Sequence, residues 1–473
     1  MTQTTIPQST QTVERIQALR QEILERDFSA RAFLFILLHI PLVVLFRWNP
    51  IFPTIHALAT LGLGLLFLVQ DRTPKRVVYI TAYITGAELL WRGTDATVFY
   101  EFGKYACILL LVLGLLKFHL IEKMTKWPLG YFALLIPSIL ILPEFDREAI
   151  SFNLAGPLAL AVAVMFFSRL SLDKDHLRRV LLALIGPAVG LGFLAALGIF
   201  EAEVIQFADA SNFETSAGIG PNQISSMMGL GAMAAILLIL LEQNKTWLRT
   251  VLFLVALWLM GQTMLTFSRG GFWNAILALA VAGFYLFPQP RTRSAFVLTA
   301  LLIFSVGYFF IFPALDDFTG SALQNRFQDL DTTGRVEIIQ ADLIAFRENP
   351  YFGVGPHQSK QYHALTFRYS SAHTEYSRLL AEHGLLGLAA LLIFVFQMSS
   401  RFIRKGTPWQ KSLITSFTMW GVLFMLHAAT RLMAPSFLIG LASAHFLMDD
   451  SAPLLSHVPF LAKRNLPGFN HHE

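Results

Sequence analysis

Arg269 lies in the short polar segment Thr266-Phe267-Ser268-Arg269-Gly270-Gly271, which separates two long apolar runs. A guanidinium group stays charged at physiological pH and can bind phosphate oxygens through two parallel hydrogen bonds. The two glycines that follow would let the backbone approach such an anion closely. We therefore interpret Arg269 as an anion-binding residue. The alternative is an arginine whose long side chain only places its charge at the membrane interface and binds no ligand.

Arg335 is the second candidate, in the one long hydrophilic stretch, residues 315–376. It opens a predicted helix that runs to about Glu348 and stops at Asn349-Pro350, because the residue before a proline avoids the helical region. An arginine at a helix N-terminus is poorly placed for the helix dipole. This position favours a functional role for Arg335 over a merely solvated one.

His373 is the candidate base. A helix is predicted to begin beside it, with Ser370, Ser371 and Thr374 as capping candidates. The positive potential of a helix N-terminus disfavours a protonated imidazole, so His373 should be neutral and able to accept a proton. The alternative is a histidine that only hydrogen-bonds within the loop.

Other charged residues are weaker candidates. Arg431, soon after His427, would add a third positive group, or else anchors the chain at the interface. Lys104 lies within an apolar run, where a charge needs a partner, and Glu101 or Glu88 is the expected one. No metal site and no cofactor are predicted, since the histidines lack zinc-like spacing and Asp329-Leu330-Asp331 is a common tripeptide.

The elements that must position these residues are membrane helices. The chain has 473 residues, of which 55% are hydrophobic and 14% charged, well below the charged share of a soluble protein. We predict an all-α polytopic membrane protein, with twelve or thirteen spans as the alternative to fourteen. The predicted spans are 32–46, 51–69, 77–91, 98–116, 128–143, 152–168, 180–200, 223–241, 248–266, 272–288, 296–314, 377–398, 410–427 and 431–447.

The segments between the spans alternate in charge. One set is rich in lysine and arginine and is predicted to be cytoplasmic, together with both termini. The other set contains Arg269, the 315–376 loop and Arg431, and is predicted to face outward. The chain would thus comprise a cytoplasmic amphipathic segment 1–31, helices over 32–314, an outer loop 315–376, helices over 377–447 and a cytoplasmic tail 448–473. A partly disordered tail is the alternative for 1–31.

Nothing indicates a cleavable signal peptide, a disulfide framework or a nucleic-acid-binding module. The first apolar run follows a polar lead-in, with no small-residue cleavage site after it. The single cysteine, Cys107, lies within an apolar run. The residues do not indicate an oligomeric state.

Three motifs occur in a recognisable order. They are the Ser-Arg-Gly-Gly break, Gly-Arg followed by Asn-Pro-Tyr-Phe-Gly-Val-Gly-Pro, and Ala-His-Thr-Glu-Tyr followed by Leu-Ala-Glu-His-Gly-Leu-Leu-Gly-Leu. This order, over about 260–390, resembles the O-antigen ligase and O-antigen polymerase superfamily of bacterial envelope enzymes. The chain departs from it at Thr374, where the family usually has asparagine, and at Ile339, near the place of a common tryptophan.

The resemblance implies a GT-C-like glycosyltransferase of the bacterial inner membrane, with its active site facing the periplasm. Such enzymes move a glycan from a polyprenyl (undecaprenyl) diphosphate to a hydroxyl of a lipid A–core sugar or of another glycan, are inverting, and need no metal. Carried over by motif, Arg269 and Arg335 would bind the diphosphate and His373 would be the catalytic base, with Arg431 as a further diphosphate-binding candidate. A polymerase of the same superfamily is the alternative within the class.

Two other classes compete with an enzyme. A transporter or lipid-linked sugar flippase should carry its ionisable and helix-breaking residues near the middle of the membrane. A non-catalytic scaffold would not need both a base and phosphate-binding groups. Because the unusual arginines and the histidine gather at one predicted face, the sequence favours chemistry at the interface.

Overall fold

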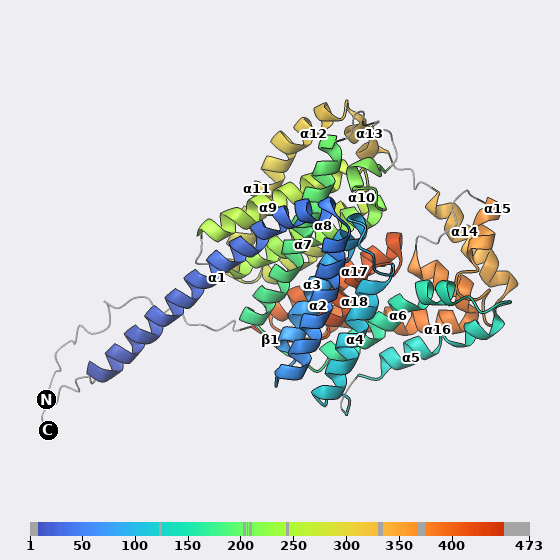
Figure 1. Ribbon diagram of the computed structural model, residues 1–473, viewed down its shortest axis with the longest axis horizontal. Helices are drawn as coiled ribbons and strands as arrows, with labels where there is room; N and C mark the ends of the chain where they lie inside the picture. Colours follow the sequence, from blue (N-terminus) through green and yellow to red (C-terminus); the bar gives the residue numbers. More distant parts are fainter. Residues whose placement is uncertain are drawn as a thin grey trace, which may run out of the picture.

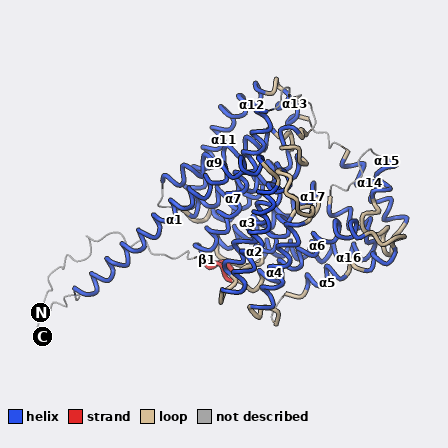
Figure 2. Tube along the Cα trace, viewed as in Figure 1, coloured by secondary structure: helices blue, strands red, loops and turns tan. Residues whose placement is uncertain are grey.

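The computed structural model describes residues 8–122, 125–201, 205, 207, 211–242, 246–329, 334–366 and 374–448, without the side chains of 8–27 and 291. Most of this part of the chain is helical, and one short pair of strands accompanies the helices (Figures 1 and 2). The fold confirms the prediction of an all-α polytopic membrane protein.

The first half comprises α1 (Gln8–Trp48), α2 (Ile51–Gln70), α3 (Lys75–Gly93), α4 (Phe102–Lys117), α5 (Trp127–Ala133), the 3-10 helix η1 (Pro137–Ile141), α6 (Arg147–Phe167), β1 (Ser171–Asp173), α7 (Lys174–Glu201) and η2 (Glu214–Ser216). The second half comprises α8 (Pro221–Leu241), α9 (Thr246–Leu265), α10 (Arg269–Leu286), α11 (Pro290–Val306), the π-helical η3 (Gly307–Ile311), α12 (Phe312–Phe318), α13 (Ala322–Gln328), α14 (Arg335–Glu348), α15 (Lys360–Thr366), α16 (Glu375–Ile403), α17 (Pro408–Ala428), α18 (Met433–Leu441) and β2 (His445–Leu447).

Eight helices of the described chain are long and apolar enough to cross a membrane. They are Phe28–Trp48, Ile51–Gln70, Arg147–Phe167, Lys174–Glu201, Pro221–Leu241, Thr246–Leu265, Thr292–Phe318 and Glu375–Ile403. Five further predicted spans correspond to α3, α4, α10, α17 and α18, which are shorter or more polar. Thirteen of the fourteen predicted spans thus have a helical counterpart, and the differences concern length and continuity.

Three elements differ from the prediction. The span predicted at 128–143 is divided into α5 and η1, because Pro137 cannot donate a backbone hydrogen bond to the preceding turn. The span predicted at 431–447 is a helix only to Leu441, and its last residues form β2, which pairs in parallel with β1. Helix α1 runs without a break from Gln8 to Trp48, so the amphipathic segment continues into the first span, and its first half extends away from the bundle (Figure 1).

Helix α8 forms the centre of the bundle and is almost entirely buried, packed against α7, α9 and α10. The contact with α10 is close because Gly271 has no side chain. A β-carbon there would lie 2.1 Å from the carbonyl oxygen of Ser225. Small residues at such crossings let membrane helices approach one another. The position of Arg269 is therefore fixed by the most buried part of the molecule.

Described contacts between loops lie at two ends of the bundle. At one end Arg47 pairs with Glu201 at 2.6 Å, and Asn212 N donates to Thr266 O at 3.0 Å. At the other end Tyr285 donates to the carbonyl of Phe402 at 3.1 Å. We call the first the site end. It contains the turns before α2, α4, α6, α10 and α18. That the site end faces the periplasm, with both chain termini in the cytoplasm, remains a prediction.

Candidate active site

The break before Arg269 is a sharp, buried turn. Phe267 is fully buried and adopts a left-handed backbone conformation, with φ of 57°, which is uncommon for a residue with a large side chain. The backbone N–H of Ser268 donates to the Thr266 hydroxyl at 3.1 Å, and Ser268 Oγ donates to Asn222 at 2.7 Å. Helix α10 then begins at Arg269. The polar residues of the break thus hold a strained turn that presents Arg269 at the site end.

The two glycines that follow Arg269 do not serve the purpose that their sequence suggested. A β-carbon at Gly270 would lie 2.6 Å from Nε2 of His427, and Gly271 faces Ser225 on α8. Both glycines therefore provide room for neighbouring helices. The prediction that they leave space for a phosphate is wrong, and Arg269 must contribute through its side chain.

Arg326, near the end of α13, was not singled out in the sequence, yet it ties the break to the loop. It is 4% exposed, and its Nε donates to the carbonyl of Phe267 at 3.1 Å. Arg269 in turn donates to the carbonyl of Arg326 at 3.4 Å and to that of Asp329. Asp329 also pairs with Arg326 at 3.6 Å. Asp329, from the tripeptide that the sequence analysis set aside as a metal site, thus contacts both Arg269 and Arg326.

Arg335 joins this cluster from α14. The residue before it, Gly334, has a left-handed φ of 76° that starts the helix, as the Gly-Arg sequence predicted. Burial lowers the pKa of the Arg335 guanidinium, and repulsion by Arg269 and Arg326 lowers it further. Arg269 contacts the carbonyl of Arg326, and the charges of both act on Arg335 from across the loop. We call Arg269, Arg326 and Arg335 the arginine cluster. Its mutual repulsion would be relieved by a bound anion.

His373, the predicted base, lies in the 367–373 segment outside the described residues. The next residue is described. Thr374 caps α16, and its hydroxyl accepts a hydrogen bond from the backbone N–H of Tyr376 at 3.3 Å. The predicted helix start is confirmed, whereas the role of His373 stays a prediction.

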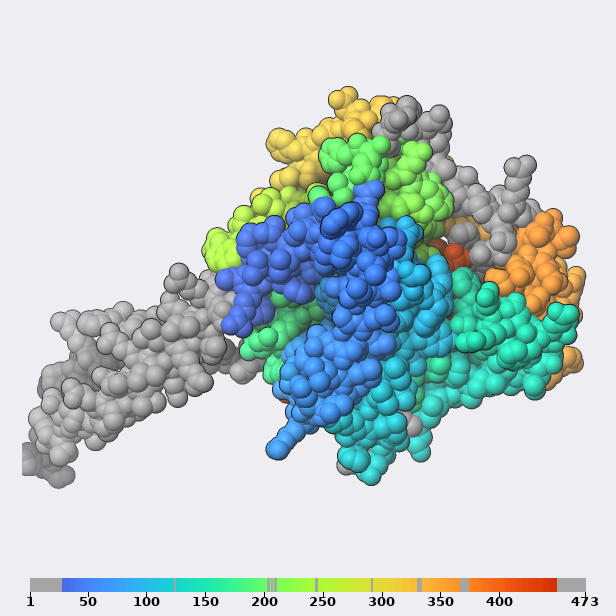
Figure 3. Space-filling model, in the orientation of Figure 1, coloured from blue at the N-terminus to red at the C-terminus, as the bar shows by residue number. Residues whose placement is uncertain are grey.

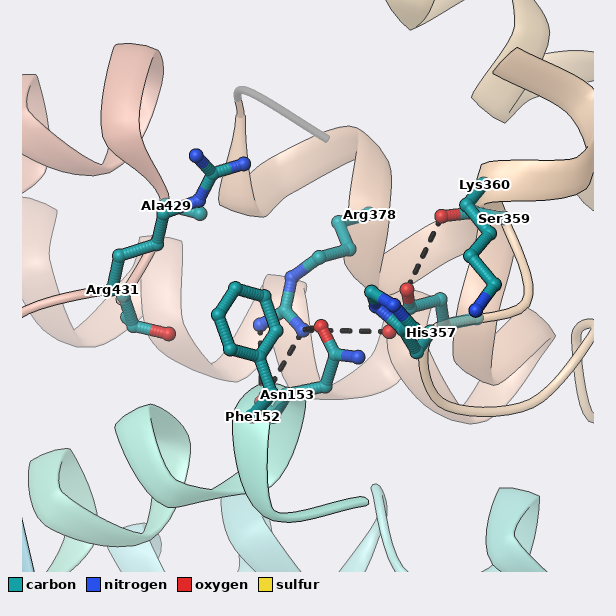
Figure 4. A pocket seen from close by; sticks show the side chains of 10 residues that line it. Phe152, Asn153, His357, Ser359, Lys360, Arg378, Ala429 and Arg431 are labelled. Atoms are coloured by element: carbon teal, nitrogen blue, oxygen red, sulfur yellow. Dashed lines mark hydrogen bonds and ion pairs between the residues drawn. The ribbon is translucent and has the colours of Figure 1, made fainter. Parts of the chain in front are cut away.

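A small pocket of about 20 Å³ lies at the first turn of α16 (Figure 4). Its centre is the buried Arg378, which donates to Asn153 Oδ1 at 2.5 Å and pairs with Glu375 at 2.6 Å and Glu382 at 3.4 Å. Arg431 also lines this pocket, on the other side of Arg378 from His357 (Figure 4). Two of the predicted site residues, Arg269 and Arg335, therefore lie in the arginine cluster, and Arg431 lies with Arg378.

The turn that carries Arg431 is held by buried charges. Both the backbone N–H and the hydroxyl of Thr430 donate to Glu375 at 3.1 Å. The carbonyl of Thr430 accepts from Lys104 Nζ at 3.3 Å, and Lys104 pairs with Glu101, which confirms the predicted buried pair. Helices α4 and α16 thus hold the α17–α18 turn from two sides. Lys104, which is unusual as a charged residue within an apolar run, therefore stabilises the turn beside the site.

A second, larger cavity of about 1040 Å³ adjoins the pocket. Phe152, His357 and Lys360 line both spaces. The space-filling view shows a hollow at this end of the molecule, with the red surface of the α17–α18 region at its bottom and the orange surface of α14 and α15 on one side (Figure 3). The volume is at the upper end of the roughly 300–1,000 Å³ typical of ligand pockets.

Residues 254–392 match the family model described as O-antigen ligase. This segment of the chain is therefore similar to the O-antigen ligase family. The matched segment runs from α9 into α16 and contains the whole arginine cluster together with His373. No curated protein matches the chain. The apolar helices indicate a multi-pass membrane protein, and its segment 254–392 is similar to the O-antigen ligase family.

Proposed function

We propose that the protein transfers a glycan from a polyprenyl diphosphate carrier to an acceptor hydroxyl at the periplasmic face, as an O-antigen ligase. The observation that carries this proposal is the arginine cluster, because three guanidinium groups beside one another suit a diphosphate. The buried turn at Phe267 and the contacts of Arg326 keep Arg269 in place before the substrate arrives. Such preorganised positive charge is what a departing diphosphate requires.

In the proposed reaction the acceptor oxygen attacks the anomeric carbon of the lipid-linked sugar. A new glycosidic bond forms as the bond from that carbon to the diphosphate oxygen breaks, with inversion at the carbon. The acceptor proton passes to the neutral imidazole of His373, and the electron pair leaves with the polyprenyl diphosphate. No metal takes part in this scheme. The arginine cluster stabilises the departing charge, and a base of this kind contributes about 10²–10⁴ in rate.

The test is glycan transfer by the purified full-length protein from a polyprenyl-diphosphate-linked glycan to lipid A–core. We expect His373→Ala to lower the rate by about 10²-fold or more with donor affinity retained. Arg269→Ala should weaken donor binding as well, and Arg269→Lys should remain impaired because an ammonium group cannot form the planar two-point contact. Arg347→Lys, on the exposed side of α14, is the matched control.

Three results would contradict the proposal. Normal transfer by His373→Ala would show that His373 is not the catalytic base. Normal donor binding by Arg269→Ala would show that Arg269 does not bind the diphosphate. Transbilayer movement of the donor without any transfer would instead favour a flippase. Supplying the donor glycan itself as the acceptor distinguishes a polymerase, which would extend it, from a ligase.

A further inference from the structure

The larger cavity has a lining that differs in kind from the arginine cluster. Aromatic rings form much of it, namely Phe99, Tyr100, Tyr105, Phe145 and Phe152. Charged groups of both signs stand among the rings, among them Asp146, Arg147, Glu148 and Lys360. None of the three arginines of the cluster lines this cavity. The two sites therefore offer different chemistry to their ligands.

The proposed substrates consist of a prenyl chain, a diphosphate and a sugar chain. The mixed lining disfavours binding of the first two. A long prenyl chain would bury carboxylates, a guanidinium and an ammonium without water, which is costly. A diphosphate would lie beside Asp146 and Glu148, where like charges repel it. A sugar chain fits both features, because its C–H faces pack on aromatic rings and its hydroxyl groups donate to carboxylates and accept from cations.

The cavity also lies beside the pocket described above. His357 lines both this cavity and the pocket of Arg378 and Arg431. The His357 ring packs edge-on against Phe152, with ring centres 5.6 Å apart. The residue has a left-handed φ of 67°, uncommon outside glycine. Strained positions of this kind persist where the surroundings over-determine them, often at ligand sites.

His357 is suited to recognising a sugar hydroxyl group by hydrogen bonds. It is half-buried, and burial lowers the pKa of its imidazole, which the charge of Lys360 lowers further. A neutral ring offers one hydrogen-bond donor and one acceptor, which matches the two capacities of a sugar hydroxyl.

We propose that this cavity, between the beginnings of α4 and α6 and the 357–360 segment, binds the acceptor glycan, and that His357 determines which terminal sugar is accepted. The inference rests on the proposed transfer reaction, for which it supplies the second substrate site. The donor diphosphate then approaches through the arginine cluster, and the acceptor sugar approaches through the cavity.

Equilibrium binding tests the cavity without turnover. The probe is the core oligosaccharide released from lipopolysaccharide of a strain that lacks this protein, titrated into the full-length protein in detergent. Phe145→Ala and Tyr100→Ala should each raise its Kd about tenfold, as expected when a packed aromatic ring is removed. The controls are Phe284→Ala and Tyr308→Ala, which remove rings of similar exposure elsewhere. Exposure is 79% and 53% for the cavity residues against 73% and 58% for the controls.

The outcomes separate this inference from the proposed function. Equal oligosaccharide affinity in cavity and control variants would overturn it, as would cavity variants that weaken binding of the lipid-linked donor alone. A wild-type protein that binds the oligosaccharide in this cavity and transfers nothing would refute the reaction and leave the cavity assignment standing.

Selectivity tests His357. The measurement is the ratio of kcat/KM for the intact core oligosaccharide to that for one lacking its terminal sugar. We expect His357→Asn, which tolerates the left-handed backbone, to lower this ratio about tenfold with donor KM unchanged. His357→Gly is the second variant, in case asparagine retains the contact. An unchanged ratio in both variants would exclude His357 from acceptor recognition.

Discussion

At the scale of single residues, the site is a set of like charges held together by backbone carbonyls. Arg269 and Arg326 donate to the carbonyls of Arg326, Asp329 and Phe267. These contacts orient the guanidinium groups, and the carboxylate of Asp329 lies 3.6 Å from Arg326. Arg378 contrasts with them, because it is buried between Glu375 and Glu382. The first arrangement suits an incoming anion, and the second suits a structural role.

Arg326 gives the prediction at this scale. Arg326→Gln should lose a charged hydrogen bond to the Phe267 carbonyl and one positive group of the cluster, so kcat/KM for the donor should fall about 10–100-fold. Arg326→Lys should recover part of the loss by restoring the charge. Steady-state kinetics with the lipid-linked donor measure both, and Arg347→Gln is the control on exposed α14. A donor KM equal to that of the wild type in Arg326→Gln would show that Arg326 does not position this site.

At the scale of elements, the motifs Ser-Arg-Gly-Gly and Gly-Arg marked Arg269 and Arg335, and the charge of Arg269 acts on Arg335. Each arginine stands at the start of a helix, which local signals predicted for Arg335. Arg326, Arg378 and the cavity could not be predicted in this way. Their importance comes from partners distant in the chain, such as Phe267 for Arg326. The two glycines were misread for the same reason, since only the packed helices reveal that His427 and Ser225 occupy the space beside them.

The crossing of α8 and α10 gives the prediction for elements. Gly271→Ala would place a β-carbon 2.1 Å from the Ser225 carbonyl, so the helices must separate, at a cost of about 1–3 kcal/mol in stability. Thermal unfolding in detergent should show a lowered Tm. Gly62→Ala in α2 is the matched control, because nothing lies within 4 Å of that position, and alanine there should be neutral or stabilising. Equal Tm values for the two variants would show that α10 is not fixed by this contact.

At the scale of the whole molecule, one chain of buried contacts joins helices that are far apart in sequence. Glu88 pairs with Arg92 at 2.5 Å and accepts from the backbone of Met433 at 2.8 Å. Lys104 and Glu375 both hold Thr430, as described above. Charges inside a membrane bundle are retained when they are paired and when function needs them. Here they fix the site end of α3, α4 and α16 around a single turn.

The orientation of the protein in the membrane is predicted from the distribution of its lysines and arginines alone. Cys107, the only cysteine of the chain, is buried, so a single introduced cysteine would be the one accessible thiol. In spheroplasts, a membrane-impermeant maleimide should label Phe145→Cys or Phe213→Cys at the site end, whose side chains are 79% and 58% exposed. It should label Arg72→Cys or Lys405→Cys, in exposed turns at the other end, only after the membrane is opened. The reverse pattern would put the arginine cluster in the cytoplasm, where a periplasmic transfer reaction has no access to it. Because the lysine- and arginine-rich loops gather at the end opposite the cluster, the positive-inside rule predicts the first pattern.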